Sequence, residues 1–198
     1  DNLFHTSTEG KVLENPRNSA PEFIFQRTTS PEKAPNKPSF ITINYKNSDP
    51  IGLNGIKLAP AKLLEKLNQI AGKNGIGRVD LVENRFIGIK SRGVYETPGG
   101  TLLIHAHRAM ESVTLDKKTM HKKDEIMPKY AELIYNGYWY SKERFKLQKI
   151  IDLKKNRVNG SVRLKLYKGN ITIESRQTKS MAYSIRKVSF EDNKTFKK

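Results

Sequence analysis

The chain has 198 residues, of which 36% are hydrophobic and 29% are charged, and its formal net charge is +17. A chain of this length can bury a core of its own, which predicts one domain or at most two. It contains no cysteine, so disulfides, thiolate chemistry and cysteine-ligated zinc are excluded. No apolar run approaches the ~20 residues that cross a bilayer. The first residues show no signal-peptide pattern and no initiator Met, so we expect a cytoplasmic fragment of a longer protein without a membrane partner.

The positive charge raises the question of nucleic acid binding. The lysines occur as scattered pairs rather than as one block, for example at 122–123, 154–155 and 197–198. No RNA-binding aromatic pattern, glycine-rich RNA clamp or zinc-finger spacing accompanies them. We therefore interpret the charge as solvated surface and predict no nucleic acid partner, with a basic nucleic-acid-binding protein as the alternative.

Residues 1–39 contain five of the nine prolines, which predicts little regular structure. Proline removes a hydrogen-bond donor and restricts the residue before it. The same segment is too apolar for a free linker, because it carries Leu3, Phe4, Phe23 and Ile24. We predict that residues 1–39 form an extended arm that packs on the remaining domain, residues 40–198, or on a neighbouring subunit.

The first half of the domain predicts a strand, a hairpin and a helix. Apolar and polar residues alternate over 40–45, which is typical of a half-buried strand. Asn54-Gly55 stands between two short apolar runs, and both residues tolerate the positive φ of a hairpin turn. Pro60 suits the first turn of a helix with an apolar stripe, which Gly72 can end.

Two further strands are predicted over residues 79–83 and 86–90, around Asn84-Arg85, and a helix over residues 101–115. A helix over residues 124–136 would tolerate Pro128 only in its first turn. Ser141 is a good N-cap for a helix that ends near Lys155 and faces inward with Phe145.

A last hairpin joins residues 162–167 and 171–173 across Gly169-Asn170, because the same alternation continues on both sides of the turn. Helices mixed with antiparallel hairpins predict the α+β class.

Two patterns that can bind metals or nucleotides are incomplete. His105 and His107 are two residues apart in a predicted helix, so their side chains point to different faces. The glycines at 75, 77, 99 and 100 are not followed by the Lys-Ser/Thr of a phosphate-binding loop, nor do they form a dinucleotide fingerprint. We predict no metal and no bound cofactor for this chain.

Glu83 is the residue that calls for an explanation. A strand with Val79 and Leu81 on one face places this carboxylate where an apolar side chain is expected, and a buried carboxylate needs a cationic partner. Two interpretations stay open. One is an internal ion pair with Arg85 or Arg92, and the other is a polar recognition site for a zwitterion.

Residues 75–100, GIGRVDLVENRFIGIKSRGVYETPGG, closely resemble the argininosuccinate synthase family. Three other stretches resemble segments of the same family in the same order. They are NLFHTSTEGKVLENP (2–16), KYAELIYNGYW (129–139) and NGSVRLKLYKGNITI (159–173). The resemblance covers nearly the whole chain and identifies it with the C-terminal half of such enzymes.

The resemblance implies a ligase that uses ATP with Mg²⁺ to adenylate the ureido oxygen of citrulline. The amine of aspartate then displaces AMP and gives argininosuccinate, a step of arginine biosynthesis. The positions that match citrulline recognition are Glu83, for the α-ammonium group, and Tyr95 and Ser7, which offer hydroxyls. Arg92 and Arg85 are further candidates. None of these residues is expected to be catalytic, because their role is orientation of the substrate.

The family's ATP-binding loop, its aspartate-binding residues and its long C-terminal helix have no counterpart in this sequence. The resemblance therefore implies a homotetramer whose isolated half binds no ATP and is inactive. An assembly domain without catalysis is a third reading. Retention of Ser7, Glu83 and Tyr95 together favours the ligase half.

Overall fold

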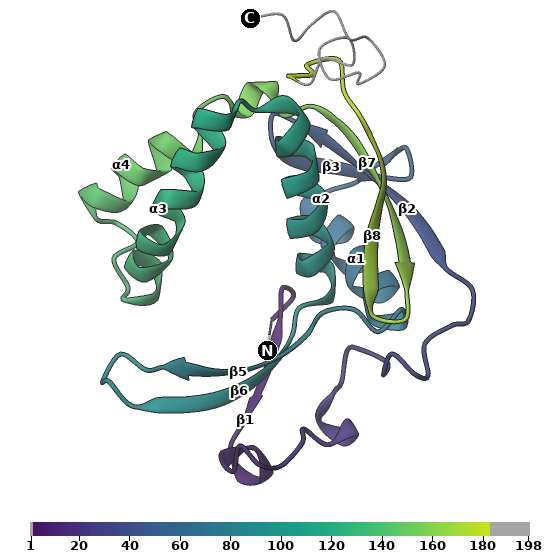
Figure 1. Cartoon of the computed structure of the whole chain (residues 1–198), viewed down its shortest axis with the longest axis vertical. Helices are drawn as coiled ribbons and strands as arrows, with labels where there is room; N and C mark the ends of the chain where they lie inside the picture. Colours follow the sequence, from purple (N-terminus) through teal and green to yellow (C-terminus); the bar gives the residue numbers. More distant parts are fainter. Residues whose placement is uncertain (1, 183–198) are drawn as a thin grey trace, which may run out of the picture.

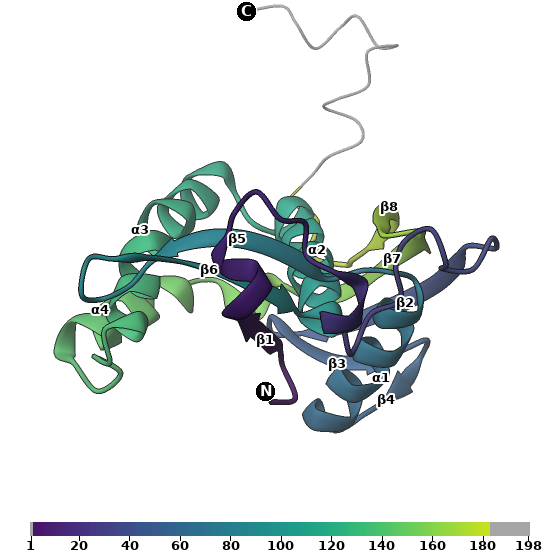
Figure 2. The same ribbon diagram turned by 90° about the horizontal axis from the view of Figure 1, so that it is seen from below.

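The computed structural model describes residues 2–182, and Figures 1 and 2 show their arrangement in two views. Within this range the chain forms four α-helices and two antiparallel sheets, which confirms the α+β class. The end of the predicted 40–198 domain and the lysine pair at 197–198 lie outside the described residues.

The larger sheet has five strands in the order β4-β3-β2-β7-β8, and every neighbouring pair is antiparallel. Its strands are β2 (Ser39–Lys46), β3 (Asp49–Leu53), β4 (Ile56–Lys57), β7 (Gly160–Tyr167) and β8 (Asn170–Gln177). The predicted strand at 40–45 and both predicted hairpins are confirmed. The turn of the last hairpin lies at Lys168-Gly169, one residue before the predicted Gly169-Asn170, because Asn170 already pairs with Tyr167. Asn54 and Gly55 take φ values of 52° and 82°, as the first of these turns requires.

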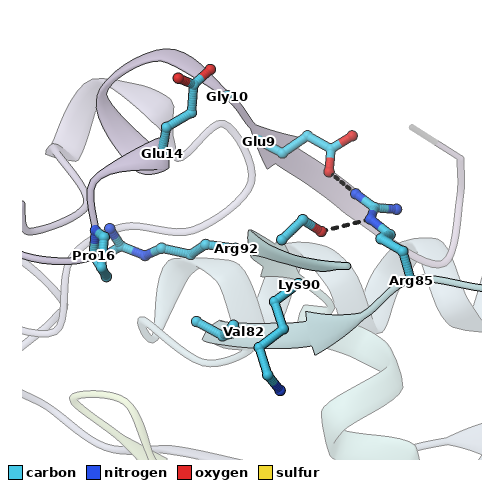
Figure 3. Close-up of a pocket in the computed structure, with 9 residues that line it drawn as sticks. Glu9, Gly10, Glu14, Pro16, Val82, Arg85, Lys90 and Arg92 are labelled. Carbon is cyan, nitrogen blue, oxygen red and sulfur yellow. Dashed lines mark hydrogen bonds and ion pairs between the residues drawn. The ribbon is translucent and has the colours of Figure 1, made fainter. Parts of the chain in front are cut away.

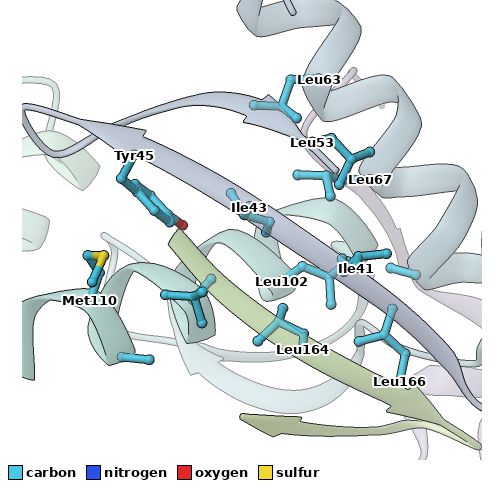
Figure 4. Close-up of a cluster of buried hydrophobic side chains, with 14 of the residues drawn as sticks. Ile41, Ile43, Tyr45, Leu53, Leu63, Leu67, Leu102, Met110, Leu164 and Leu166 are labelled. Carbon is cyan, nitrogen blue, oxygen red and sulfur yellow. The ribbon is translucent and has the colours of Figure 1, made fainter. Parts of the chain in front are cut away.

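The core lies between this sheet and two helices, α1 (Pro60–Lys73) and α2 (Pro98–Thr114) (Figure 4). Alternate residues of β2 and β7 supply the sheet side, because successive side chains of a strand point to opposite faces. The fully buried members from both layers include Ile43, Leu63, Leu67, Leu102, Met110, Leu164 and Leu166. Burial of each such side chain contributes about 1.5–3 kcal/mol, so this layer is the main source of stability.

The predicted end of α1 at Gly72 is wrong by one residue. The helix continues to Lys73, and the positive φ of 73° belongs to Gly75. Gly72 is needed for close packing instead, because a Cβ there would lie 2.1 Å from the carbonyl oxygen of Arg27 in the arm.

The smaller sheet has the order β1-β6-β5, with β1 (Thr6–Glu9), β5 (Arg78–Asn84) and β6 (Lys90–Glu96). The predicted strand at 86–90 is wrong, because residues 85–89 form the turn between β5 and β6 and Lys90 already begins β6. Arg85 donates its backbone N–H to the carbonyl of Ile89 at 2.7 Å, and Gly88 donates to Arg85 at 2.8 Å. The apolar residues that suggested a strand are exposed at the tip: Phe86 by 76%, Ile87 by 75% and Ile89 by 58%.

The arm contributes β1, which was not predicted, and two short 3₁₀ helices at Lys11–Glu14 and Glu22–Ile24. Glu96, at the end of β6, is 2% exposed and binds the arm. Its carboxylate accepts the backbone N–H groups of Gln26, Arg27 and Thr28 at 2.8, 2.9 and 2.8 Å, and the Thr28 hydroxyl at 2.6 Å. Residues 6–9 and 26–28 are thus both hydrogen-bonded to β6.

The helices α3 (Lys117–Tyr135) and α4 (Lys142–Ile151) form an antiparallel pair that projects to the same side as the β5–β6 tip (Figures 1 and 2). The predicted start of α3 at residue 124 is wrong, because Asp116 caps the helix by accepting the N–H of Thr119 at 3.0 Å. Pro128 lies inside α3 on an exposed surface, where solvent can reach the carbonyl that its missing N–H leaves unbonded.

The N-cap of α4 is Ser141, as predicted, and it accepts the N–H of Arg144 at 3.1 Å. Two other expectations for this helix are wrong. It ends at Ile151 rather than near Lys155, and Phe145 is 48% exposed rather than inward.

A buried ion pair joins α2 to α3. Lys123 contacts Glu111, and the two residues are only 8% and 4% exposed. Replacing Lys123 by Met is expected to lower the free energy of unfolding by about 3 kcal/mol, because it removes the buried partner of Glu111 and leaves this carboxylate only the more distant Arg108, at 3.8 Å. Urea denaturation followed by circular dichroism measures this loss.

Lys122→Met is the matched control, because Lys122 pairs with Glu125 at 3.1 Å on the exposed side of the same helix. This change should leave the free energy of unfolding nearly unchanged. Equal losses in the two variants would show that the Glu111–Lys123 pair does not hold α3 against α2.

Candidate functional site

Three of the predicted substrate residues lie on one face of the smaller sheet. Ser7 of β1 lies opposite Tyr95 of β6, and Tyr95 lies opposite Val79 of β5. Four residues further along β5, Glu83 lies opposite Ser91 of β6. Since directly opposed residues project to the same side of a sheet, Ser7, Tyr95 and Glu83 share a face.

Tyr95 and Glu83 are directly bonded. The hydroxyl of Tyr95 donates to Oε1 of Glu83 at 2.6 Å. This bond raises the pKa of Tyr95 to about 12, so the hydroxyl keeps its proton at neutral pH. Among the described residues no hydrogen bond to Oε2 of Glu83 is found, which leaves that oxygen available as an acceptor.

Gly93 makes this arrangement possible. The Tyr95 ring lies along the sheet over Gly93, where a Cβ would come within 2.7 Å of the ring carbon Cε2. A glycine inside a strand commonly marks such a close approach. Any larger residue at position 93 would push the Tyr95 hydroxyl away from Glu83.

The surroundings of these groups are partly apolar and open. Val79 is 44% and Leu81 is 38% exposed, although both lie on the same face as Glu83. The Glu83 side chain is 25% exposed, and Ser7 is exposed. The face therefore combines one carboxylate and two hydroxyls with apolar surface, which suits a small zwitterion with an aliphatic stem.

The two arginine candidates lie on different sides of the sheet. Arg85 shares the face of Glu83, with its Nη1 at 3.9 Å from Oε1 of Glu83. Arg92 lies opposite Val82, on the other face, and binds Asp80 at 2.8 and 2.6 Å. This hydrogen bonding holds the pKa of Asp80 below its usual value.

Arg92 also donates to the carbonyl of Asn18 at 2.9 Å, so it fastens the arm to the sheet. The structure therefore does not bring Arg92 to Glu83, so an ion pair between them, one of the interpretations that the sequence left open, does not form. The alternative ion pair, between Glu83 and Arg85, has an N–O distance of 3.9 Å, which is near the upper limit for an ion pair.

A pocket of about 530 Å³ opens where β1 ends beside β6 (Figure 3). Glu9, Arg85 and Ser91 are among the residues that line it, whereas Glu83 is not. Solvent thus reaches the guanidinium of Arg85 from the side away from Glu83.

The glycines considered for phosphate binding have structural roles in turns and helix ends. Gly75 and Gly77 take positive φ values of 73° and 106° in the turn after α1. The N–H of Gly99, in the first turn of α2, donates to Oδ1 of Asn68 at 2.9 Å. Within residues 2–182, no group of three or more His, Asp or Glu side chains is placed to hold a metal ion. No helix in that range has the length and apolar character needed to cross a membrane.

The whole chain, residues 1–198, matches the family model described as "Arginosuccinate synthase C-terminal domain". The chain belongs to the argininosuccinate synthase family. Its relatives include the argininosuccinate synthase of Pelagibacter ubique (strain HTCC1062), which is 84% identical over 198 residues. That match covers 100% of this chain and 50% of the relative.

The synthases of Zymomonas mobilis subsp. mobilis and Caulobacter vibrioides (strain NA1000 / CB15N) are 57% and 55% identical over 192 and 193 residues. These matches cover 97% and 98% of this chain and 47% of each relative. The chain thus spans about half the length of the curated argininosuccinate synthases that it matches.

Three residues at the candidate site were not identified from the sequence: Glu9, Ser91 and Gly93. A signal for Glu9 was present, because Thr6 and Thr8 are β-branched and Ser7 and Glu9 alternate with them, as in a strand. The glycine between Arg92 and Val94 was a second signal, since glycine in a strand suggests close packing. Nothing local distinguished Ser91.

Proposed function

We propose that the complete protein to which this half belongs is an argininosuccinate synthase. It joins citrulline and aspartate at the expense of ATP and releases AMP and diphosphate through a citrullyl-adenylate. The observation that supports this proposal best is the Tyr95–Glu83 hydrogen bond of 2.6 Å, on a sheet face that Ser7 shares. This half supplies the citrulline site.

Each part of citrulline has a counterpart on this face. The α-ammonium group meets the unbonded Oε2 of Glu83 in a charge-assisted hydrogen bond. The hydroxyls of Tyr95 and Ser7 serve its other polar atoms. The methylene stem lies along Val79 and Leu81, which are partly exposed beside Glu83. These residues orient citrulline, and none of them transfers a proton.

The adenylation step draws on groups outside this half. Backbone N–H groups at a helix N-terminus can bind phosphate, but that of Gly99 at the start of α2 is already bonded to Asn68. We therefore assign ATP with its Mg²⁺, and aspartate, to the remaining half of the enzyme. The proposal further implies a cytoplasmic homotetramer in which the citrulline face meets the nucleotide-binding half.

Two assays test this proposal. The complete synthase should form argininosuccinate from citrulline, aspartate and ATP. The 198-residue chain alone should show no measurable ATP binding by calorimetry and only weak citrulline binding, because a half-site makes only part of the contacts that must offset the cost of immobilising the ligand. Adding the other half in trans should restore some activity.

Failure of the complete synthase to form argininosuccinate would overturn the proposed function. Turnover of ATP by the 198-residue chain alone would instead show that the nucleotide chemistry is assigned to the wrong half.

A further inference from the structure

We propose that Asn54 is a site of spontaneous deamidation, at which the side-chain amide of the folded protein is converted to aspartate and isoaspartate. The site lies in the turn between β3 and β4 of the larger sheet. The inference does not depend on the proposed function, whose residues Glu83 and Tyr95 lie on the smaller sheet.

The reaction requires an asparagine followed by a residue whose backbone nitrogen can attack it. That nitrogen forms a C–N bond to Cγ of the asparagine, and the amide nitrogen leaves as ammonia. Water then opens the resulting succinimide at either carbonyl carbon, which gives aspartate or isoaspartate. Glycine is the most favourable second residue, because it has no Cβ to hinder its nitrogen or restrict its backbone. The sequence contains four such Asn-Gly pairs, which begin at Asn54, Asn74, Asn136 and Asn159.

In the pair at Asn54 the attacking nitrogen is free. Asn54 and Gly55 are both exposed, and a Cβ at Gly55 would meet no atom within 4 Å. No hydrogen bond from the N–H of Gly55 is found among the residues that the structure describes. The φ values of 52° and 82° are those of a type I′ turn of two residues, which leaves this nitrogen open to solvent.

The backbone of β2 activates the side chain that is attacked. The N–H of Thr42 donates to Oδ1 of Asn54 at 2.8 Å. Attack on Cγ places negative charge on this oxygen, so a donor already aimed at it stabilises the transition state. A second contact, from the N–H of Asn54 to the carbonyl of Thr42 at 2.7 Å, holds the turn against β2 and keeps that donor in place.

Two of the other pairs have a bonded nitrogen. The N–H of Gly75 donates to the carbonyl of Gly72 at 3.1 Å, and Asn74 itself is only 1% exposed. The N–H of Gly137 donates to the carbonyl of Ile134 at 3.1 Å, where α3 ends. Attack by either nitrogen first requires that its hydrogen bond be broken.

The pair at Asn159 has a side chain that is fixed at both ends. Its Oδ1 accepts the N–H of Asn47 at 2.8 Å, and its Nδ2 donates to the carbonyl of Asn156 at 2.6 Å. The following glycine is tightly packed, because a Cβ at Gly160 would lie 2.0 Å from the carbonyl oxygen of Gln177. Ring closure would have to break the bond to Asn156 in a place without free space.

Deamidation at Asn54 would change both the charge and the backbone of this turn. Each event replaces a neutral amide by a carboxylate. Isoaspartate also routes the backbone through the side chain, which adds a methylene group to a turn of two residues. Because β4 is the edge strand and pairs only with β3, isoaspartate should loosen it from the sheet.

The test compares the four sites within one sample of the complete protein. The folded protein is incubated at physiological temperature in mildly alkaline buffer, and its peptides are analysed by liquid chromatography and mass spectrometry. Asn54 should deamidate at least about tenfold faster than each of the other three sites, because a free nitrogen and an oriented donor lower the barrier. Asn54→Asp supplies the standard for the aspartate product.

The matched control is the same protein unfolded in urea, where each pair keeps only its neighbours in sequence. The four rates should then lie within about threefold of one another, since barriers that differ by about RT give rates of this spread. A second site in the folded protein that reacts as fast as Asn54 would overturn the proposal. So would the same tenfold preference for Asn54 in urea, because the local sequence rather than the turn would then cause it.

Discussion

Replacing Glu83 by Gln in the complete synthase is expected to raise the KM for citrulline about tenfold or more, because a hydrogen bond to a charged group contributes roughly 1.5–3 kcal/mol. The KM for ATP should stay nearly the same, since Glu83 lies on the face proposed for citrulline and ATP is assigned to the other half. The Gln side chain keeps the shape of Glu and can still accept the Tyr95 hydroxyl through its amide oxygen. Steady-state rates at varied citrulline, with ATP and aspartate saturating, measure the effect.

Circular dichroism of the same variant controls for folding. An unchanged citrulline KM in a folded Glu83→Gln enzyme would mean that the carboxylate only holds Tyr95 and Arg85 in place. The site would then have a structural role, and the substrate would have to bind elsewhere.

Replacing Glu96 by Gln is expected to lower the free energy of unfolding by about 3 kcal/mol, because the variant loses a buried charge with several hydrogen bonds. Both oxygens of Glu96 accept bonds from the arm: Oε2 from Gln26, and Oε1 from Arg27 and from the N–H and hydroxyl of Thr28. A Gln side chain has one acceptor oxygen, so its amide group would face at least one N–H donor of the arm. The arm should detach more easily from β6.

Two measurements report this change: urea denaturation gives the free energy of unfolding, and limited trypsin digestion gives the rate of cleavage within the arm. The control is Glu65→Gln, which removes an exposed pair with Lys62 on α1 and should leave both quantities nearly unchanged. Glu96→Gln behaving like this control would show that the arm is held by β1 and Arg92 rather than by Glu96.

The elements that the sequence predicts well are those with a strong local signal. The strand at 40–45 and the last hairpin show regular alternation, and Asn54-Gly55 and Gly169 supply turn residues that tolerate positive φ. The strand at 86–90 failed because its apolar residues are exposed at a tip, and local sequence does not reveal whether an apolar side chain finds a partner. The start of α3 failed because Pro128 is tolerated in the interior of an exposed helix.

From the residues alone, the only part of the site that could be predicted was Glu83, a carboxylate on a strand face where an apolar side chain is expected. Its partners came from the resemblance to the synthase family, because no local pattern brings Ser7 to Tyr95 across the rest of the arm, the strands β2 to β5 and helix α1. The ion pair of Glu9 with Arg85 depends on the same long-range pairing of β1 with β6. Strand pairing between distant segments is thus what the sequence did not reveal.

The central claim is that Glu83 recognises the α-ammonium group of citrulline, and a substrate without that group tests it most directly. 5-Ureidopentanoate is citrulline with the α-amino group removed. The complete synthase should prefer citrulline to this analogue by about tenfold or more in kcat/KM. Glu83→Gln should reduce this preference to nearly one, because the Gln side chain carries no negative charge to bind the ammonium group that distinguishes the two substrates. A Glu83→Gln enzyme that kept the full preference for citrulline would contradict the account.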